Sequence, residues 1–264
     1  MNPSVSEPAH PRERPILIVT ALDEERAPLE ALASGVRRGD FRAGGDGDLL
    51  LGTIDESLVA LLRCGVGKIA ATLATTSAME LAPRGVISVG SAASLHPGFA
   101  IGDVVISTEV LQHDFGAARS GGFELFGYGA PLPSTGDPRI RAEEPLGTAA
   151  LDAARGLGPH LVDPAGMGRK VRLSHGVIAT GDSFVNDHAT RDSIRRRTGA
   201  DLVEMEGAAI AFVASRHRTP WLVVRSVSDA GDGGAHVSFE SYLPIAAKNA
   251  ATVVAAILPA FGRY

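Results

Sequence analysis

The stretch Asp201–Leu202–Val203–Glu204–Met205–Glu206–Gly207–Ala208–Ala209 joins a short apolar run to an alanine-rich segment through two carboxylates that stand two residues apart. The apolar run is typical of a buried strand and the segment after Gly207 of a helix, so this stretch predicts a strand that leads into a helix. Residues i and i+2 of a strand point to one face, so Glu204 and Glu206 are expected to be neighbours of like charge. Such a pair is destabilising unless something binds it, and we therefore expect a ligand at one of the two.

The same alternation of strand and helix recurs along the whole chain. Short runs rich in Val, Ile and Leu predict strands at residues 15–22, 58–64, 85–89, 104–111, 176–180, 202–205 and 221–227. Helical patterns lie between them at residues 24–33, 68–81, 141–157, 189–197, 206–216 and 242–258. Most strand runs are continuously apolar, the pattern of strands covered on both faces. The sequence thus predicts an α/β fold with one domain, in which helices flank a central mixed but largely parallel β-sheet.

Two segments fall outside this alternation. Residues 1–14 contain three prolines, mixed charges and no apolar core, which predicts a disordered N-terminal tail before a domain over residues 15–264. Residues 120–138 are rich in Gly and Pro and lack periodicity, so we expect a long loop there. Long ordered loops are often lids or binding loops.

The composition restricts the possible partners and the compartment. The net charge of -5 argues against the concentrated basic patch that nucleic-acid binding needs, and the one basic cluster, residues 191–197, is interrupted by Asp192 and predicts a solvated helix face. Cys64 is the only cysteine, which excludes an intrachain disulfide and a cysteine-rich metal site and fits a reducing cytoplasm. The longest apolar runs, 15–22 and 250–261, are shorter than the roughly 18 residues of a membrane span. We expect a soluble, cytoplasmic protein that binds neither nucleic acid nor membrane.

Acidic residues recur where the predicted strands end. Glu25 follows the first strand, Glu206 follows the strand of the opening stretch, and Asp229 follows the last strand. Capping and turns also explain acids in such places, because Asp and Glu are favoured at helix N-termini. In an open α/β sheet, however, ligands bind outside the carboxyl ends of the strands. Converging carboxylates without metal-ligand spacing suggest acid/base cleavage of a glycosidic-type bond, with no metal and no cofactor.

Glycine-containing turns offer further candidate ligand sites. Gly65–Ala70 matches the G-x-G-x-x-A dinucleotide fingerprint, but the acid expected about 20 residues later is missing, so a tight strand-to-helix turn is the better interpretation. An NAD-dependent dehydrogenase is a distant alternative that rests on this fingerprint alone. Gly90–Ser94 lets backbone approach a ligand closely and does not match the nucleophile elbow G-x-S-x-G. Phe184, which follows Gly181, is either a core aromatic or a platform for a flat ligand.

Taken in order, these stretches resemble the nucleoside phosphorylase superfamily, and within it the 5′-methylthioadenosine/S-adenosylhomocysteine nucleosidases. The resemblance runs from about Ile16 to Leu258 and rests on the blocks ALDEE, CGVGKIAAT, ISVGSAASLHPGFAIGDVVIS, HD, FGY, IATGDSFVN, DLVEMEGAAIA, VVRSVSDAGD and HVSFESYLPIAAK. It implies a nucleoside phosphorylase-like fold and hydrolysis of the N-ribosidic bond of adenine nucleosides through an oxocarbenium-like transition state.

The resemblance also implies a role for each residue that matches a family motif. Asp229 would be the general acid that protonates N7 of adenine, which requires a raised pKa, and Glu25 would hold and deprotonate the attacking water. The other matched residues would bind substrate or water: Glu206 and Met205 at the ribose, Phe184 and the backbone of Val185 at adenine, Ser91 and Arg225 at the water, Ser228 at Asp229, and Leu22, Val66, Phe239 and Leu243 at the 5′ substituent. A homodimer is implied, with Phe126 completing the pocket of the partner subunit.

Two departures from the family pattern bear on substrate preference. Gly90–Ser94 reads GSAAS where many relatives have GSAGG, and the interval between His113–Asp114 and Phe126–Tyr128 is several residues longer than usual. The chain could instead be a phosphorylase, a nucleosidase for another purine nucleoside such as futalosine or AMP, or a noncatalytic nucleoside-binding protein. We favour water over phosphate as the nucleophile because phosphate needs several cationic or backbone donors, whereas Arg26 is the only base beside the opening acids.

Overall fold

Twelve strands and six α-helices are formed by residues 14–39, 48–129, 136–164, 166 and 168–263, the part of the chain that the computed structural model describes. The strands are β1 (Ile16–Thr20), β2 (Ser34–Arg38), β3 (Asp48–Ile54), β4 (Ser57–Arg63), β5 (Gly85–Ser94), β6 (Val104–Gln112), β7 (Gly116–Arg119), β8 (Gly122–Leu125), β9 (Arg139–Arg141), β10 (Leu173–Thr180), β11 (Leu202–Glu204) and β12 (Trp221–Asp229). The helices are α1 (Asp23–Leu32), α2 (Lys68–Ala78), α3 (Glu144–Ala153), α4 (His188–Thr198), α5 (Gly207–Arg216) and α6 (Ala235–Ile257). Each strand and helix expected from the sequence is present, with ends that differ by a few residues.

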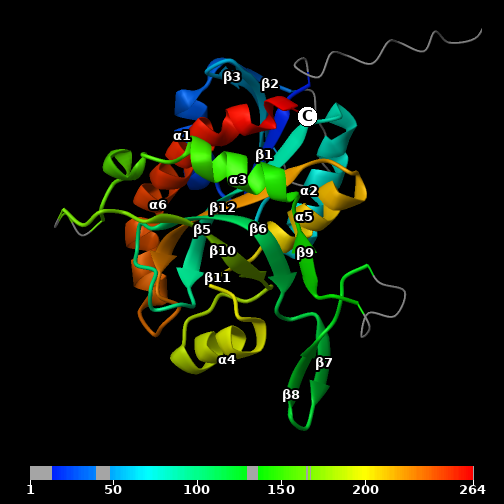
Figure 1. Ribbon diagram of the computed structural model, residues 1–264, viewed down its shortest axis with the longest axis vertical. Helices are drawn as coiled ribbons and strands as arrows, with labels where there is room; N and C mark the ends of the chain where they lie inside the picture. Colours follow the sequence, from blue (N-terminus) through cyan, green and yellow to red (C-terminus); the bar gives the residue numbers. More distant parts are fainter. Residues whose placement is uncertain (1–13, 40–47, 130–135, 165, 167, 264) are drawn as a thin grey trace, which may run out of the picture.

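The main sheet is mixed and partly closed on itself. β5, β12, β6, β10 and β11 pair in that order, and β11 pairs back onto β5, so that these five strands form a ring. β1, β4, β3 and β2 extend the sheet from β5 (Figure 1). Five of the ten pairings in this sheet are parallel and five are antiparallel. The expectation of a largely parallel sheet was therefore wrong, because β2 and β3 were not recognised and because tertiary pairing sets β6 antiparallel to β12.

The segment expected to be a long loop begins with regular structure instead. β7 and β8 form an antiparallel hairpin that projects from the body of the molecule (Figure 1). The guanidinium of Arg197 in α4 lies over the ring of Phe123 in β8, 5.4 Å from its centroid. Residues 130–135 of the expected loop, like residues 1–13 of the expected N-terminal tail, lie outside the described residues.

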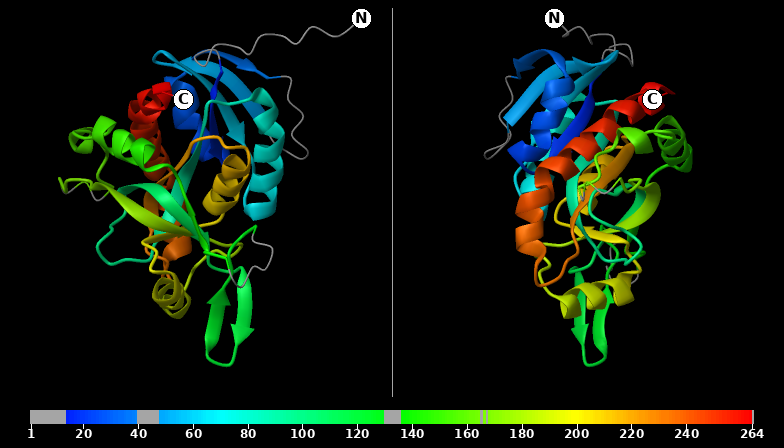
Figure 2. Two further views of the ribbon diagram at one scale, coloured as in Figure 1. Left: turned by 45° about the vertical axis from the view of Figure 1, so that its right-hand side comes forward. Right: turned by 90° about the vertical axis from the view of Figure 1, so that its left-hand side faces the viewer.

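Helices cover both faces of the sheet and one end of it (Figure 2). On one face α1, α3 and α6 bury apolar side chains such as Leu29 and Val254 against the sheet. On the other face α2 and α5 contribute residues such as Ala74 and Ile210 to a second apolar cluster. α4 closes one end through the fully buried Ile194. The carboxyl ends of β1, β11 and β12 are left open to a cavity between these layers.

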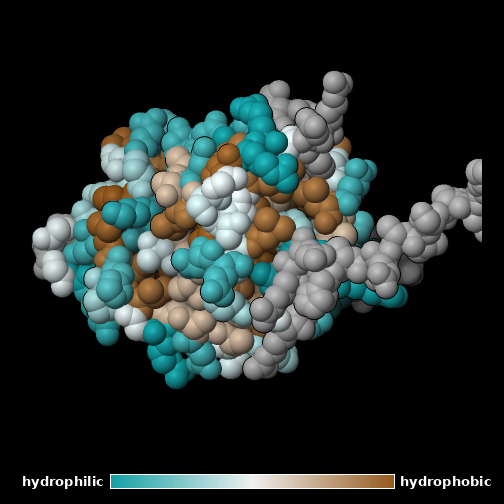
Figure 3. Space-filling model, turned by 90° about the horizontal axis from the view of Figure 1, so that it is seen from above, coloured by the Kyte–Doolittle hydropathy of each residue, from teal (hydrophilic) through white to brown (hydrophobic). Residues whose placement is uncertain are grey.

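The last helix is long and apolar. The stretch Ala235–Gly262 is long and apolar enough to cross a membrane by length and composition, so the expectation that no run reaches this length was wrong. However, 56% of its most apolar window is buried inside the protein, where α6 packs on β5, β12 and α1, and this is typical of a core helix. Seen from the end of the molecule that carries β2 and β3, polar and apolar residues are interspersed (Figure 3).

The basic cluster at residues 191–197 is more than a solvated helix face. It forms most of α4, whose N-cap Asp187 accepts bonds from the backbone of the first turn. Arg195 Nη1 donates to the carbonyl oxygen of Ala200 at 2.7 Å, and Arg197 Nη2 donates to the carbonyl oxygen of His113 at 3.0 Å. Two of these arginines thus tie α4 to neighbouring loops, which the sequence pattern did not predict.

Candidate active site

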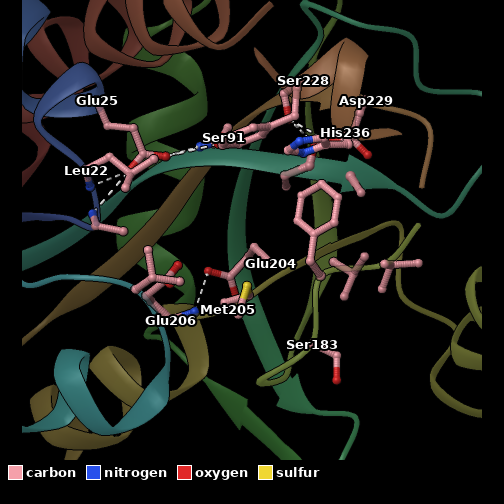
Figure 4. A pocket seen from close by; sticks show the side chains of 18 of the residues that line it. Leu22, Glu25, Ser91, Ser183, Glu204, Met205, Glu206, Ser228, Asp229 and His236 are labelled. Carbon is pink, nitrogen blue, oxygen red and sulfur yellow. Dashed lines mark hydrogen bonds between the residues drawn. The ribbon is translucent and has the colours of Figure 1, made fainter. Parts of the chain in front are cut away.

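A cavity of about 570 Å³ lies at the carboxyl ends of β1, β11 and β12 and is bounded by the end of α6 nearest to them (Figure 4). Its size is typical of sites for small organic ligands. Nine of the eleven residues predicted to act on substrate line it: Glu25, Ser91, Phe184, Val185, Met205, Glu206, Ser228, Asp229 and Phe239. Leu22 and Val66 line it as well. Arg225 and Leu243 are buried and are not among the lining residues.

Glu25 is the one acid of the opening motif that turns into the protein. It stands at the third position of α1, where its Oε2 accepts bonds from the backbone N–H groups of Ala21 (3.0 Å) and Leu22 (3.2 Å). Its Oε1 accepts bonds from both the backbone N–H and the hydroxyl of Ser91, each at 3.0 Å. An ionised carboxylate, which only accepts hydrogen bonds, suits this set of donors. Asp23 and Glu24 are exposed, and the favourable placement of negative charge at a helix N-terminus accounts for both. Glu25 is buried and lines the cavity as well.

Gly90 makes room for this carboxylate. A Cβ atom at Gly90 would lie 2.7 Å from Glu25 Oε1, which is closer than such atoms approach one another. The backbone of β5 therefore comes within hydrogen-bond reach of Glu25 only because residue 90 has no side chain. The glycine that the sequence assigned to ligand approach serves to admit a carboxylate of the same chain.

The two carboxylates of the opening stretch have separate partners. β11 ends at Glu204, and Glu206 lies beyond the strand as the N-cap of α5. The expectation that the two side chains share one strand face was therefore wrong. Glu204 forms a buried ion pair with Arg225, whose Nε donates to Oε2 at 3.1 Å. The backbone N–H groups of Glu206 (3.1 Å) and Gly207 (2.7 Å) donate to the same oxygen. Glu204 thus neutralises Arg225 and anchors the start of α5.

Arg225 is fully committed to this structural role. Its Nη2 also donates to Ser88 Oγ at 3.0 Å and its Nη1 to the carbonyl oxygen of Val224 at 3.1 Å. The side chain is 2% exposed and lies beneath the cavity floor. Arg225 was expected to help place the attacking water. Its donors are used by Glu204 and Ser88 and it does not line the cavity, so it can act on the site only through these neighbours.

Glu206 is left facing the cavity. Its Oε1 accepts a bond from the backbone N–H of Gly67 at 2.8 Å, across the mouth of the turn before α2. Burial, followed by the negative charge of Glu204, raises the pKa of Glu206 to about 8. Glu206 is therefore largely protonated near neutral pH, and hydrogen bonds donated by a ligand would favour its ionised form.

Asp229 occupies the other end of the cavity. It is 1% exposed, and its Oδ2 and Oδ1 accept bonds from Ser228 Oγ and from the backbone N–H of Gly231, each at 2.9 Å. Burial raises the pKa of Asp229 against the opposing effect of these two bonds. Figure 4 shows Glu25 and Glu206 on one side of the cavity and Asp229 on the other. The buried carboxylates of Glu25 and Asp229 thus face one cavity from different sides.

Aromatic side chains flank Asp229. Phe184 is 46% exposed, and its ring meets Phe239 of α6 edge to face at 5.8 Å between centroids. Val185, the next residue, is buried in the wall of the cavity. A ring that is 46% exposed and lines the cavity is not a core aromatic, so Phe184 is available to stack on a flat ligand.

Ion pairs outside the cavity hold two of its loops together. Lys68 Nζ lies 2.6 Å from Asp114 Oδ1, and Asp114 Oδ2 accepts a bond from the backbone N–H of Asp182 at 2.9 Å. Asp182 Oδ1 in turn accepts a bond from the backbone N–H of Lys68 at 2.8 Å. The N-terminus of α2 is therefore occupied by Glu206 and Asp182 of the chain itself, which agrees with a tight turn at Gly65–Gly67 and leaves no place there for a dinucleotide phosphate.

Comparison with known proteins identifies the family. The model of the phosphorylase superfamily matches residues 15–259. The chain belongs to the phosphorylase superfamily. The 5′-methylthioadenosine/S-adenosylhomocysteine nucleosidase of Anoxybacillus flavithermus is 38% identical over 206 residues, which cover 77% of this chain and 81% of that protein.

Solved structures of the superfamily have the same fold. The 5′-methylthioadenosine/S-adenosylhomocysteine nucleosidase of Neisseria meningitidis, in complex with methylthio-immucillin-A, aligns with a TM-score of 0.78 at 31% identity and covers 92% of this chain and 98% of that chain. The futalosine hydrolase of Helicobacter pylori aligns with a TM-score of 0.76 at 28% identity and covers 92% and 97%.

The two departures from the superfamily pattern have different positions. Of the two groups added in GSAAS, only Ala93 lines the cavity. Ser94 turns away from it and donates to the carbonyl oxygen of His96 at 2.8 Å. The longer interval before Phe126 contains the hairpin of β7 and β8. Of the residues in these two departures, Ala93 is the one that lies on the described cavity wall.

Sequence reasoning missed three polar residues at the cavity wall: Ser183, and the pair His236 and Glu240. His236 and Glu240 stand on α6 beside Phe239, at positions one helical turn apart. The spacing of His236, Phe239 and Glu240 at i, i+3 and i+4 is the signal that could have found them, since such residues share one helix face. Among the described residues, no group of three or more His, Cys, Asp or Glu side chains is arranged to hold a metal ion.

Proposed function

We propose that this protein hydrolyses the N-ribosidic bond of adenine nucleosides, 5′-methylthioadenosine and S-adenosylhomocysteine, and releases adenine. The observation that carries the proposal is the set of three buried carboxylates on one cavity, with Glu25 and Glu206 on one side of it and Asp229 on the other. The curated relative from Anoxybacillus flavithermus and the structure from Neisseria meningitidis, both named for this activity, support it.

Asp229 is the general acid. Departure of adenine as a neutral base requires a proton at N7, and burial raises the pKa of Asp229, so its carboxyl group holds a proton to higher pH than an exposed aspartate does. Ser228 fixes the orientation of the carboxyl group through the bond to Oδ2. Phe184 stacks on the purine, and the backbone of Val185 binds its edge, so that N7 faces Asp229.

Glu25 and Ser91 hold the attacking water. Ser91 lines the cavity, and its hydroxyl donates a hydrogen bond to Glu25 Oε1, so a water beside this hydroxyl reaches both groups. Glu25 takes the proton of this water as it attacks the anomeric carbon, whose positive charge the carboxylate also stabilises. Glu206 accepts hydrogen bonds from the ribose hydroxyls, and Met205 packs beneath the sugar.

Water is favoured over phosphate by the charges of the site. No lysine or arginine is among the described residues that line the cavity, whereas phosphate requires several cationic or backbone donors. Arg26, the one base beside the opening acids, pairs with Asp23 (3.0 Å) and Asp48 (3.2 Å). Arg225 pairs with Glu204. A phosphorylase reaction thus has no site for its nucleophile among these groups.

The functional unit is a homodimer in the cytoplasm. Val66, Ile69 and Leu73 lie on one face of α2 and its preceding turn and are 53%, 83% and 48% exposed. Tyr128, which is 42% exposed, packs edge to face on Phe212 of α5, next to α2. An apolar surface of this kind is typical of an interface, and Val66 belongs both to it and to the cavity, so a second copy here would complete the 5′ pocket with Phe126.

A panel of substrates tests the proposed reaction. Adenine or hypoxanthine release is measured from methylthioadenosine, S-adenosylhomocysteine, adenosine, inosine, futalosine and AMP, each with and without phosphate. We expect phosphate-independent release of adenine from the first two. Strict phosphate dependence with a ribose-1-phosphate product would refute hydrolysis, and a preference for futalosine would favour the activity for which the Helicobacter pylori neighbour is named.

A further inference from the structure

The mouth of the cavity carries one basic and one acidic side chain that the proposed reaction does not use. His236 Nε2 and Glu240 Oε1 lie 3.4 Å apart on successive turns of α6, and both side chains line the cavity. They are 69% and 67% exposed, so they stand at its edge and not in its depth. Phe239, between them in sequence, faces the interior.

Stability does not account for this pair. An exposed i,i+4 ion pair contributes only about 0.3–0.5 kcal/mol to a helix. Among the described residues, the only polar contact of either side chain is with the other. The ring of Phe184 meets the rings of both His236 and Phe239 edge to face, at 6.3 Å and 5.8 Å between centroids, so an aromatic surface lies beside the pair. Both groups are therefore available to a ligand that extends out of the cavity.

We propose that His236 and Glu240 bind the charged amino-acid end of a 5′-thioether nucleoside, with the ammonium on Glu240 and the carboxylate on an N–H of His236. This inference rests on the proposed function, because it places the ribose between Glu206 and Asp229 and sends the 5′ substituent past Phe239 to the mouth. A zwitterionic amino-acid group thus finds an acceptor for its ammonium and a donor for its carboxylate at the mouth. The pair thereby favours S-adenosylhomocysteine over methylthioadenosine, whose methyl group ends before this point.

The charges also discriminate against other 5′ substituents. A phosphate group has two negative charges and no ammonium, so Glu240 would repel it and only His236 could bind it. An uncharged tail gains nothing from either group. The mouth is therefore complementary to a zwitterion and not to an anion.

The substitution Glu240→Gln tests this assignment against a matched change. Glu80→Gln, at an exposed position outside the cavity, makes the same chemical change and serves as the control. The quantity compared is the ratio of kcat/KM for S-adenosylhomocysteine to kcat/KM for methylthioadenosine. We expect Glu240→Gln to lower this ratio by about two- to fivefold through KM, the range of one exposed charge pair, and Glu240→Lys to lower it further. Glu80→Gln should leave it unchanged.

Changing the ligand provides the second measurement. S-adenosylhomocysteine acetylated on its amino group lacks the ammonium. The kcat/KM of the wild type should therefore fall on the acetylated ligand by the same factor as Glu240→Gln lowers it on the free amine. For Glu240→Gln, acetylation of the ligand should lower kcat/KM little further. An unchanged ratio in Glu240→Gln, or an equal effect of that substitution on the amine and on the acetylated ligand, overturns the assignment. Failure of the proposed function is seen separately, as a wild type that releases no adenine from methylthioadenosine.

Discussion

Replacing Glu204 and Glu206 by Gln makes one chemical change at two positions two residues apart, and the structure assigns opposite consequences to it. Glu204 is the carboxylate that pairs with the buried Arg225. Glu206 faces the cavity, and its carboxylate accepts a hydrogen bond from the backbone N–H of Gly67. We therefore expect Glu204→Gln to damage stability and Glu206→Gln to damage turnover.

The cost of Glu204→Gln follows from the charge that it leaves behind. Arg225 is 2% exposed and donates to Glu204 from two of its nitrogens. Removing one member of a buried ion pair costs about 3–5 kcal/mol, because the remaining charge stays buried without a counterion. This is a large part of the roughly 5–15 kcal/mol that holds a domain folded. Replacing both residues by Met should cost less than the sum of the single changes, since no charge is then left.

The effect of Glu206→Gln on stability depends on pH. The folded pKa of Glu206, about 8, lies above its ordinary value of 4.5, so the folded state retains a proton that the unfolded state releases between these values. The stability contributed by this proton is fully present below pH 4.5 and is lost as the pH rises to 8. Gln cannot ionise and so bears no such cost. The stability of the variant relative to the wild type therefore rises across this window, by an amount on the order of 5 kcal/mol.

Urea unfolding at pH 5, 7 and 9 measures both effects, with Glu80→Gln as the exposed control. Adenine release from methylthioadenosine is measured on the same samples. Glu204→Gln should be less stable than the wild type at every pH. Glu206→Gln should lose turnover while its stability relative to the wild type rises with pH. Equal destabilisation by the two substitutions, or a Glu206→Gln difference that does not change with pH, would refute this division of roles.

Further predictions concern the chemical groups themselves. Asp229→Asn should lower kcat by about 10²–10⁴-fold, as expected for loss of a general acid, while calorimetry still detects ligand binding. In the wild type, kcat/KM should fall as the pH rises past the raised pKa of Asp229, and a profile that is flat there would contradict its role as a proton donor. Gly90→Ala places a Cβ 2.7 Å from Glu25 Oε1, so kcat should fall by about 10²-fold through displacement of that carboxylate, and unchanged turnover would show that the backbone can yield. Binding of a ribose ligand near pH 7 should release a proton from Glu206, seen as a calorimetric heat that depends on the buffer.

Much of the fold follows from local pattern. The apolar runs and the helical periodicity predict the strands and helices that surround the site, because burial and period are properties of neighbouring residues. The strands β2, β3, β7, β8 and β9 escaped prediction. β2 and β9 are short, and β7 and β8 lie in a region rich in glycine, so their local signal is weak. Their partners, not their composition, make them strands.

The candidate site was predictable as a set of residue types at strand ends. Glu25, Glu206 and Asp229 each follow a predicted strand. β1 and β12 both pair parallel to β5, so the sheet brings Glu25 and Asp229 to one edge. Glu206 follows β11, which pairs antiparallel to β5, so closure of the strand ring and not parallel pairing brings it to the cavity. The same reasoning could not find His236 and Glu240, because they stand on a helix whose approach to that edge depends on packing against β12 and β5.

The sequence by itself determined the order of elements, the acids available for catalysis and the glycines that let backbone and carboxylate meet. Only the tertiary structure decided which acid does what. Glu204 is neutralised by Arg225, 21 residues away, and Glu206 is held by Gly67, 139 residues away. The pKa and the role of a carboxylate depend on burial and on such distant charges and donors, and these are set by how the chain folds back on itself and not by its nearest neighbours.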